Sequence, residues 1–292
     1  MNKPSIIVGM GIGQLYKDVL TKLGQEVITV DLDPNKGADY TDVDQAISTH
    51  LKFKTAHICT PNFTHAELTN KLSACSSIVF VEKPGLRTPE EWTQAAQSSA
   101  RVMMVKNNMW RSNMDELRAL AQEAKQVNIQ WIRKNCIPHP GSWFTTRELA
   151  FGGVSRDLMP HLLSLYIAMN PEWGKEQVND YSAVQNWMLA QIESTEYGTV
   201  NSNGTYDVDD HCAIKFGNKW NLTADWRSMD KEDSSIEFIM PDNTVERFEL
   251  GWCPEDAYQR MIQDAVNNIT NSTFWNKQFA EDVWIHQMIS KL

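Results

Sequence analysis

The chain has 292 residues, with 27 Lys and Arg against 37 Asp and Glu, so its formal net charge is −10 at pH 7. Hydrophobic residues make up 42% and charged residues 22%, which is typical of a globular protein and excludes a disordered one. At roughly 150 residues per domain, this length favours two domains. The acidic balance argues against a general nucleic-acid or membrane-surface partner, because both need clustered Lys and Arg.

The charge is unevenly distributed along the chain. Residues 1–109 carry 11 basic and 11 acidic side chains, so the whole net charge lies after residue 109. Nine of the 11 tryptophans also come after residue 130. This asymmetry indicates two halves that are built differently.

Five cysteines are scattered through the chain without any C-x-x-C pair: Cys59, Cys75, Cys136, Cys212 and Cys253. An odd, scattered set predicts neither a disulfide framework nor a metal site, and it favours a reducing compartment. We therefore expect a cytoplasmic protein. No run approaches the 18 apolar residues that a membrane span needs.

The first third alternates short apolar runs with amphipathic segments. The runs cover residues 5–8, 26–30, 55–59, 77–81 and 102–105. Strands buried on both faces and separated by helices are typical of a parallel sheet with right-handed crossovers. We place a boundary near residue 110, with a nucleotide-binding domain over residues 1–110 and a second domain over residues 111–292.

The second half is rich in strands. Alternating apolar residues over 210–226 predict a hairpin with a two-residue Gly217-Asn218 turn, and residues 236–250 predict another. Two helices, over residues 254–269 and 274–292, close the chain. The fold class is thus α/β, with a parallel N-terminal sheet and a second α+β domain.

Glycines follow the first predicted strand directly, as Gly9-Met10-Gly11-Ile12-Gly13. Gly9 allows a tight turn, and Gly11 lets the backbone amides, including that of Ile12, approach a pyrophosphate at the N-terminus of the next helix. A full G-x-G-x-x-G would place a small residue where Gln14 stands. Either Gly13 takes the role of the third glycine of this motif one position early, or the glycine loop is one residue shorter than the usual one.

The second predicted strand ends in Asp31, 22 residues after Gly9. A carboxylate there can accept hydrogen bonds from both adenosine ribose hydroxyls, and it repels a 2′-phosphate. Asp33 adds a second negative charge nearby. The sequence therefore predicts NAD as the cofactor in preference to NADP.

Polar clusters follow the next two long strands, at the sheet edge where parallel sheets bind ligands. Thr60-Pro61-Asn62-Phe63-Thr64-His65 follows one strand, and Glu82-Lys83-Pro84 follows the other. Each cluster also has a purely structural interpretation, as a helix-initiating turn and as a solvated loop. A lysine buried near a nicotinamide could instead polarise a substrate oxygen.

A third cluster lies in residues 152–166, where Asp157 and His161 are four residues apart. On one helix they would share a face, and a carboxylate beside an imidazole orients it and raises its basicity. Such a pair is also common as an ordinary helix-surface contact. Pro160 removes one helical hydrogen bond, so the helix could instead begin there.

Taken together, the ordered motifs Gly9-x-Gly11, Thr60-Pro61-Asn62-x-x-His65, Glu82-Lys83-Pro84 and Gly152-Gly153-x-x-x-Asp157-x-x-x-His161 make the chain resemble the glucose–fructose oxidoreductase / inositol dehydrogenase / MocA (Gfo/Idh/MocA) family. The resemblance implies a Rossmann domain, a C-terminal domain with a large, mostly antiparallel open sheet, and an NAD(P)-dependent oxidoreductase of sugars or polyols. It also implies a homodimer or homotetramer assembled through that sheet. Gln14, and Met159 where many members have Gly, depart from the family pattern.

By the same resemblance, Lys83 looks like the catalytic lysine, and Asp157 and His161 look like the carboxylate and the general acid/base. Thr60, Pro61, Asn62, His65 and Glu82 look like cofactor-facing positions. Two other functions remain open, a biliverdin-type reductase of a conjugated substrate and a non-catalytic NAD-sensing protein. The presence of all three catalytic residue types disfavours both.

One local feature bears on the substrate. Residues 131–161 contain four basic residues, Arg133, Lys134, Arg147 and Arg156, against two acidic ones. These charges could simply be scattered over strand and loop surfaces. Alternatively, they could form a pocket for a carboxylate or phosphate, as on a uronate or a nucleotide-activated sugar.

Overall fold

A computed structural model describes residues 3–292, and it divides the chain into two compact units. The first unit comprises residues 1–107 and 254–286, and the second comprises residues 108–253 and 287–292. The expected division at residue 110 differs in one respect, because the segment 254–286 packs with the N-terminal part. Its two helices carry side chains that complete the first unit's core.

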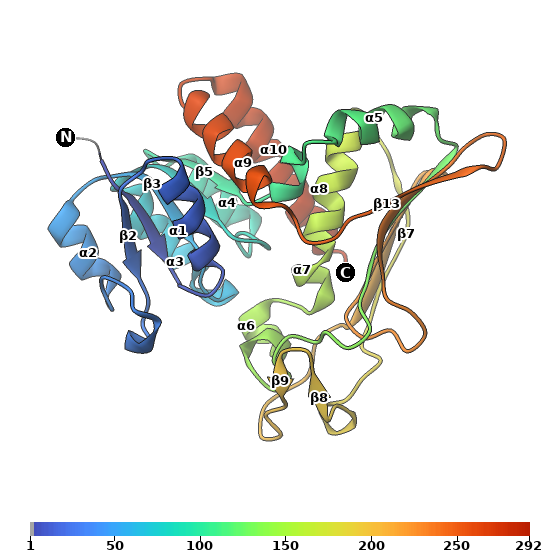
Figure 1. The fold of residues 1–292 in the computed structure, drawn as a ribbon, viewed down its shortest axis with the longest axis horizontal. Coiled ribbons are helices and arrows are strands. Elements are labelled where there is room, and N and C mark those ends of the chain that lie inside the picture. Colours follow the sequence, from blue (N-terminus) through green and yellow to red (C-terminus); the bar gives the residue numbers. More distant parts are fainter. Residues whose placement is uncertain (1–2) are drawn as a thin grey trace. The chain divides into compact units, whose positions relative to one another are not determined.

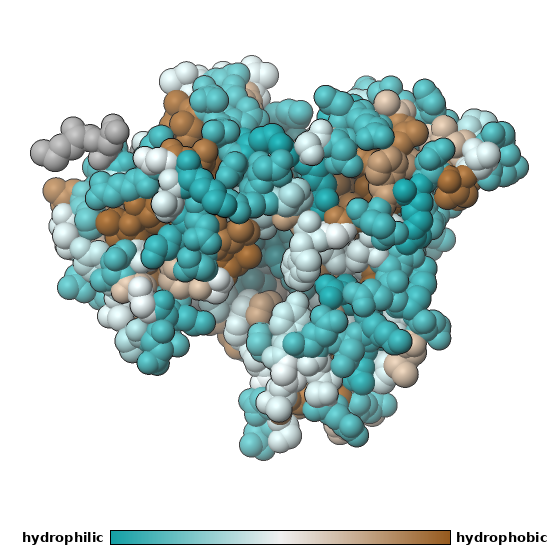
Figure 2. Space-filling view, viewed as in Figure 1, coloured by the Kyte–Doolittle hydropathy of each residue, from teal (hydrophilic) through white to brown (hydrophobic). Residues whose placement is uncertain are grey.

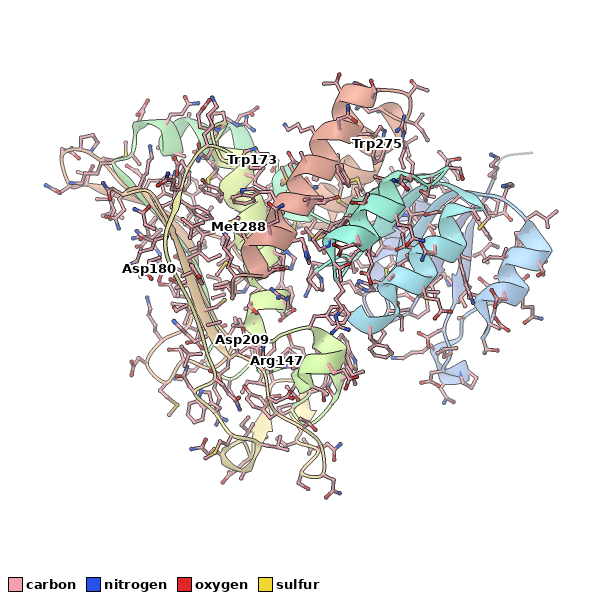
Figure 3. The ribbon with its side chains drawn as sticks, turned by 180° about the vertical axis from the view of Figure 1, so that it is seen from behind. Arg147, Trp173, Asp180, Asp209, Trp275 and Met288 are labelled. Atoms are coloured by element: carbon pink, nitrogen blue, oxygen red, sulfur yellow. The ribbon has the colours of Figure 1, made fainter. Side chains whose placement is uncertain are left out.

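The first unit contains a five-stranded parallel sheet in the order β2-β1-β3-β4-β5. Its strands are β1 (Ser5–Val8), β2 (Val27–Val30), β3 (Phe53–Ile58), β4 (Ser76–Val81) and β5 (Arg101–Met104). Its helices are α1 (Gly13–Lys22), α2 (Val43–His50), α3 (His65–Ser73), α4 (Pro89–Ala96), α9 (Glu255–Asn267) and most of α10 (Ser272–Ile289). Figures 1 and 3 show α1 on one face of the sheet and α3 and α4 on the other, which is the predicted Rossmann arrangement.

Two contacts explain why α9 and α10 belong to the first unit. In α9, the Tyr258 ring meets the buried Tyr16 ring of α1 edge-on at 5.4 Å. From α10, the buried Asp282 carboxylate pairs with the buried Lys106 ammonium, and it accepts a hydrogen bond from the Met104 amide at 2.9 Å. The Lys106 and Asp282 side chains are 0% exposed, and the buried Glu281 carboxylate of α10 lies 3.4 Å from the same ammonium, so Lys106 needs α10 for its charge partners.

The second unit is built on a six-stranded sheet in the order β13-β12-β6-β11-β10-β7. Its strands are β6 (Gln126–Ile132), β7 (Val178–Val184), β10 (His211–Phe216), β11 (Trp220–Asp225), β12 (Asp233–Ile239) and β13 (Val245–Glu249). Only the β6–β11 pair is parallel among these strand pairs. The predicted mostly antiparallel sheet, and with it the α/β fold class, is confirmed.

Helices cover one face of this second sheet. They are α5 (Met114–Glu123), α6 (Arg147–Ala150), α7 (Val154–Asp157) and α8 (Met159–Met169), and a small hairpin of β8 (Ser194–Thr195) and β9 (Gly198–Thr199) completes the unit. The Tyr166 ring of α8 stacks on Phe216 at 4.3 Å, so α8 lies on the apolar face. The opposite face is polar, and Asn128 bridges Asn221 and Glu237 across three strands.

Both predicted hairpins are confirmed as β10–β11 and β12–β13. The predicted two-residue turn is wrong, however. Phe216 pairs with Trp220, which leaves a three-residue loop in which Gly217 adopts a positive φ of 52°. Three-residue loops are a common hairpin connection after two-residue turns, and glycine adopts a positive φ at little steric cost.

The visible surface is mainly hydrophilic, with apolar side chains in separate groups (Figure 2). Large exposed apolar residues, such as Leu32, Leu51 and Trp252, are far apart in the sequence. Within residues 3–292, no helix is both long enough and apolar enough to cross a membrane.

The buried His57 predicts an acid-dependent loss of stability. Burial lowers the pKa of His57 from 6.5 to about 3, so below pH 6.5 the unfolded chain takes up a proton that the folded chain refuses. The free energy of unfolding should therefore fall by up to about 1.4 kcal/mol per pH unit as the pH drops below about 6. In His57→Gln this contribution should disappear, which urea unfolding at several pH values would measure.

The matched control is His139→Gln, since His139 is exposed. It should keep the wild-type pH dependence of stability. If wild type and His57→Gln had the same slope between about pH 6 and 4, His57 would not be the source of the acid sensitivity.

Candidate functional site

The candidate residues of the first unit lie at the carboxyl ends of adjacent strands. The glycine turn follows β1, Asp31 follows β2, Thr60 follows β3 and Glu82 follows β4. Since the strand order is β2-β1-β3-β4, these loops are neighbours along one sheet edge. Parallel sheets bind their ligands at this edge.

The glycine turn packs against the loop after β3. Gly9 has a φ of +95°, and a Cβ on it would lie 2.6 Å from the Cys59 carbonyl oxygen. A Cβ on Gly13, the first residue of α1, would lie 2.9 Å from Ile7 Cγ2. Gly13 therefore allows the close packing of helix on strand that the third glycine of the fingerprint provides. In sequence terms, Gly13 performs this role one position early.

The turn has the features that a dinucleotide phosphate needs. A Cβ on Gly11 would meet no heavy atom within 4 Å, so space is open beside its backbone. Helix α1 has no side-chain cap at Ile12 and no acidic residue in its first turn. The partial positive charge of this helix end is thus not neutralised by a side chain of α1, which suits a pyrophosphate.

Asp31 is held rigidly beside the glycine turn. Its carboxylate accepts hydrogen bonds from the Met10 amide at 2.6 Å and from the Asp33 amide at 2.9 Å. Each carboxylate oxygen retains a further acceptor position. The geometry therefore suits the acceptance of ribose hydroxyls that the sequence predicts, and the residues of this edge fit NAD.

The Glu82 side chain supports the lysine loop. It accepts a hydrogen bond from the Tyr16 hydroxyl of α1 at 2.6 Å, and its other oxygen accepts from the Lys83 amide at 3.2 Å. Burial and the Glu82 carboxylate raise the pKa of Tyr16 well above its usual value, so Tyr16 remains a neutral donor. Tyr16 was missed from the sequence, because it resembles one more apolar residue of an amphipathic helix.

His65 joins the loops after β3 and β4. Its two ring nitrogens each lie 2.9 Å from a main-chain carbonyl oxygen, that of Gly85 and that of Thr60. The side chain is buried, and burial lowers its pKa. Both ring nitrogens are thus engaged by the protein, and these contacts give His65 a supporting position between the two loops.

The rest of the β3 loop is a short helical turn. Pro61 precedes a single 3-10 turn over Asn62–Thr64, and the Pro61 carbonyl accepts a hydrogen bond from the Thr64 hydroxyl at 2.8 Å. Asn62 is half-buried and is the first residue of this turn rather than its cap. Lys83 is also half-buried and is followed by a cis peptide bond to Pro84.

In the second unit, Asp157 and His161 are on consecutive helices. Helix α7 ends at Asp157 and α8 begins at Met159, with Pro160 in its first turn. The expected continuous helix is therefore interrupted, because Pro160 has no N–H to continue the hydrogen-bond ladder. The sequence had left a helix start near Pro160 open.

Other segments of the second unit fix these two side chains. The Trp226 indole N–H donates to the Asp157 carboxylate at 2.8 Å. The Asn108 amide lies 3.2 Å from His161 Nδ1, and the Trp131 ring lies 5.4 Å from the imidazole ring. Trp131 and Trp226 therefore contribute to this site in addition to the sheet core.

A buried carboxylate that the sequence had not indicated anchors α7. Asp209, which is 3% exposed, accepts hydrogen bonds from the amides of Gly153 and Ser155 and from the Ser155 hydroxyl (Figure 3). A Cβ on Gly153 would lie 1.8 Å from the Asp209 carbonyl oxygen, so only glycine fits there. The sequence feature that could have indicated this carboxylate is the pair Asp209-Asp210 directly before the alternating residues of β10.

Three of the four basic residues of segment 131–161, the arginines, have partners within the second unit. Arg133 forms ion pairs with Glu196 at 3.1 Å and Glu232 at 2.9 Å. Arg147 and Arg156 donate to main-chain carbonyl oxygens. These contacts favour the interpretation that the charges stabilise loops, and they lend no support to an anion pocket.

Comparisons with known proteins agree with this architecture. A model of the oxidoreductase family Gfo/Idh/MocA, described by its NAD-binding Rossmann fold, matches residues 25–106. The chain is 31% identical over 181 residues to a protein of Amycolatopsis mediterranei named as a UDP-kanosamine synthase oxidoreductase subunit. That match covers 56% of this chain and half of the relative's length. The match confirms the resemblance to the Gfo/Idh/MocA family, with its NAD-binding Rossmann fold, over residues 25–106.

Solved structures share the fold over nearly the whole chain. GenD2 from gentamicin A biosynthesis, in complex with NAD, superimposes with a TM-score of 0.75 at 17% identity, covering 99% of this chain and 93% of that one. A levoglucosan dehydrogenase with NADH and levoglucosan gives 0.71 at 15% identity, with 100% and 97% covered. A myo-inositol dehydrogenase of Corynebacterium glutamicum gives 0.73 at 13% identity, with 99% and 95% covered.

The position of Asp31 predicts how the chain distinguishes the two dinucleotides. Asp31→Asn keeps an oxygen for the Met10 amide but removes the charge that repels a 2′-phosphate. The affinity for NADPH relative to NADH should rise about tenfold, equivalent to about 1.4 kcal/mol. Calorimetric titration with each nucleotide would measure this ratio without any substrate.

Asp44→Asn serves as the control, because Asp44 is an exposed carboxylate on α2. It should leave the ratio unchanged. An Asp31→Asn variant with the wild-type ratio would show that Asp31 does not contribute to the discrimination.

Proposed function

Because residues 25–106 match the model of the Gfo/Idh/MocA oxidoreductase family with its NAD-binding Rossmann fold, we propose that this protein is an NAD-dependent oxidoreductase of a sugar, a polyol or a sugar derivative. The observation that carries the proposal is the set of three supported loops at one sheet edge of the first unit. There the open glycine turn, the fixed Asp31 and the Tyr16–Glu82 support of Lys83 occur together.

In this proposal Gly9, Gly11, Ile12, Gly13 and Asp31 bind the nucleotide, with Thr60, Pro61 and Asn62 at the neighbouring loop. NAD, when bound, supplies the hydride acceptor for a C–H bond of the substrate. Glu82 and His65 hold the loops on either side of the cofactor position. This supporting role follows from the contact of Glu82 with Tyr16 and from those of His65 with Gly85 and Thr60.

Lys83, Asp157 and His161 are proposed to act on the substrate hydroxyl or carbonyl. The Lys83 ammonium donates a hydrogen bond to the substrate oxygen and stabilises negative charge as it develops. The His161 imidazole holds and exchanges the proton of the same oxygen. Asp157, oriented by Trp226, accepts a hydrogen bond from a neighbouring hydroxyl of the substrate or orients His161.

Lys83→Ala and His161→Ala test the catalytic assignment. Each should lower turnover by about a hundredfold or more, which is typical of the loss of a general acid/base or an oxyanion donor. Binding of NADH, followed by fluorescence, should stay nearly intact. Steady-state rates at saturating NAD would measure the loss.

Lys54→Ala and His50→Ala change the same residue types elsewhere in the first unit, and both should retain wild-type rates. Near-normal turnover of both Lys83→Ala and His161→Ala would refute the catalytic assignment. Binding of NADH without turnover of any sugar by the wild type would instead favour an NAD-sensing protein.

The substrate class is a separate part of the proposal. Of the four proteins described above, two are named as dehydrogenases of levoglucosan and myo-inositol, and one is named for UDP-kanosamine. Arg133, Arg147 and Arg156 of segment 131–161 already have partners within the second unit. We therefore expect neutral polyols and sugars to be oxidised faster than uronates. An assay of NADH formation across neutral polyols, uronates and nucleotide sugars would measure this order, and activity confined to uronates or nucleotide sugars would reverse it.

The proposal includes assembly through the second sheet as a homodimer or homotetramer. Its polar face presents the Asn128, Asn221 and Glu237 network and the Arg247 ion pairs with Asp233 and Glu249. Side chains already ordered by mutual hydrogen bonds lose little entropy when a second copy covers them.

A further inference from the structure

Four aromatic side chains of the second unit form a continuous row, which we call the aromatic strip. The Trp143 and Phe144 rings stack at 3.8 Å between centroids, and the Phe144 ring lies 6.1 Å from that of His139. The His139 ring in turn lies 5.3 Å from the ring of Tyr197, in the turn between β8 and β9. Tyr197 and His139 are exposed, and Trp143 and Phe144 are half-buried. The strip therefore has a side that is open to a ligand.

The backbone that carries the two stacked rings is held against residues 201–207. The Thr145 hydroxyl accepts a hydrogen bond from the Gly141 amide at 2.9 Å and donates one to the Thr205 carbonyl oxygen at 2.8 Å. A Cβ on Gly141 would lie 2.1 Å from the Asn201 carbonyl oxygen, so glycine permits this close contact. Rings on a backbone that is already ordered lose little entropy when a ligand covers them.

Hydrogen bonds connect the strip to the Asp157 carboxylate. Trp226 donates its indole N–H to Asp157 at 2.8 Å, and its carbonyl oxygen accepts from the Cys136 amide at 2.9 Å. The residue that precedes Tyr197 donates its amide hydrogen to the Asn135 carbonyl oxygen at 3.0 Å. Partial burial raises the pKa of Tyr197 to about 12, and the Asp157 charge adds to this shift. Tyr197 thus lies within electrostatic range of Asp157.

The Tyr197 hydroxyl is available to a ligand. Tyr197 is 41% exposed, and its hydroxyl has no hydrogen-bond partner within residues 3–292. Because its pKa is raised, the phenol stays neutral near pH 7. A neutral phenol both donates and accepts hydrogen bonds, and its ring presents an apolar face.

A cyclic sugar or cyclitol matches this combination of groups. Its C–H bonds form an apolar surface on a face of the ring, and its hydroxyls project around the rim. Small-molecule sites likewise combine aromatic walls with a few placed polar groups. We propose that the aromatic strip, with Tyr197 as its main contact, binds the apolar face of a cyclic sugar or cyclitol whose hydroxyls reach Asp157.

This inference rests on the proposed function and specifies its substrate class. An open-chain polyol offers the same hydroxyls, but it has no rigid face to pack on the strip, and it loses more conformational freedom when it binds. Tyr197 thereby determines specificity for rings over open chains, while Lys83, Asp157 and His161 keep the roles proposed above.

Saturation-transfer NMR on the full chain with NADH measures binding without turnover. The probes are myo-inositol and D-glucose as rings, and D-sorbitol as an open chain. We expect saturation to be strongest at ring C–H hydrogens, and D-sorbitol to bind more weakly than the better cyclic probe. In Tyr197→Ala the dissociation constant of that cyclic probe should rise about tenfold, equivalent to about 1.4 kcal/mol.

Two further variants separate the ring of Tyr197 from other effects. Tyr197→Phe keeps the aromatic face and loses only the hydroxyl, so its affinity should stay within about threefold of the wild type. Tyr181→Ala removes another exposed tyrosine of the second unit, on β7 (Val178–Val184), and should bind the probes as the wild type does.

The inference is overturned if no cyclic probe binds, if the wild type binds D-sorbitol as tightly as the rings, or if Tyr197→Ala keeps the wild-type affinity. The proposed function is judged separately, by NADH formation and by the turnover of Lys83→Ala and His161→Ala. Tyr197-dependent binding of a ring without any turnover would support the strip and contradict the proposed function. Turnover with binding that does not depend on Tyr197 would do the reverse.

Discussion

The requirement that a buried polar group must have a partner governs how this protein places its functional loops. Glu82 and Tyr16 satisfy each other beside Lys83, and His65 spans two carbonyl oxygens between neighbouring loops. In the second unit, Asp209 accepts the amides at the start of α7. In each case a side-chain hydrogen bond joins two segments that are distant in sequence, and it restricts the position of the loop or helix that carries a proposed functional residue.

The same requirement explains why residues 254–286 pack with the N-terminal part of the chain. Lys106, at the end of the last strand of the Rossmann sheet, is completely buried, and its charge needs the Asp282 carboxylate of α10. Burial raises the pKa of Asp282 to about 6, against the lowering effect of Lys106. Removal of Lys106 would leave the buried carboxylates of Asp282 and Glu281 without this cation, so the closing helix is an integral part of the nucleotide-binding unit.

Charge counted along the sequence differs from charge available to a ligand. Segment 131–161 is locally basic, yet Glu196 and Glu232 lie far along the chain and pair with Arg133. Arg147 and Arg156 donate to main-chain carbonyl oxygens. An isolated count therefore overestimates the positive charge that a substrate would meet, because folding pairs residues that are distant in sequence.

The sequence by itself determined the Rossmann sheet, both hairpins and the position of the glycine turn, since these depend on local periodicity and on backbone freedom at Gly9 and Gly13. It did not predict the central strand β6 or the roles of Tyr16, Asn108 and Asp209, and it left open whether a new helix begins near Pro160. Only the tertiary structure decided these, because hydrogen bonds such as Tyr16–Glu82 and Asp209–Ser155 join residues separated by more than fifty positions. Neither residue of such a pair reveals its partner through spacing.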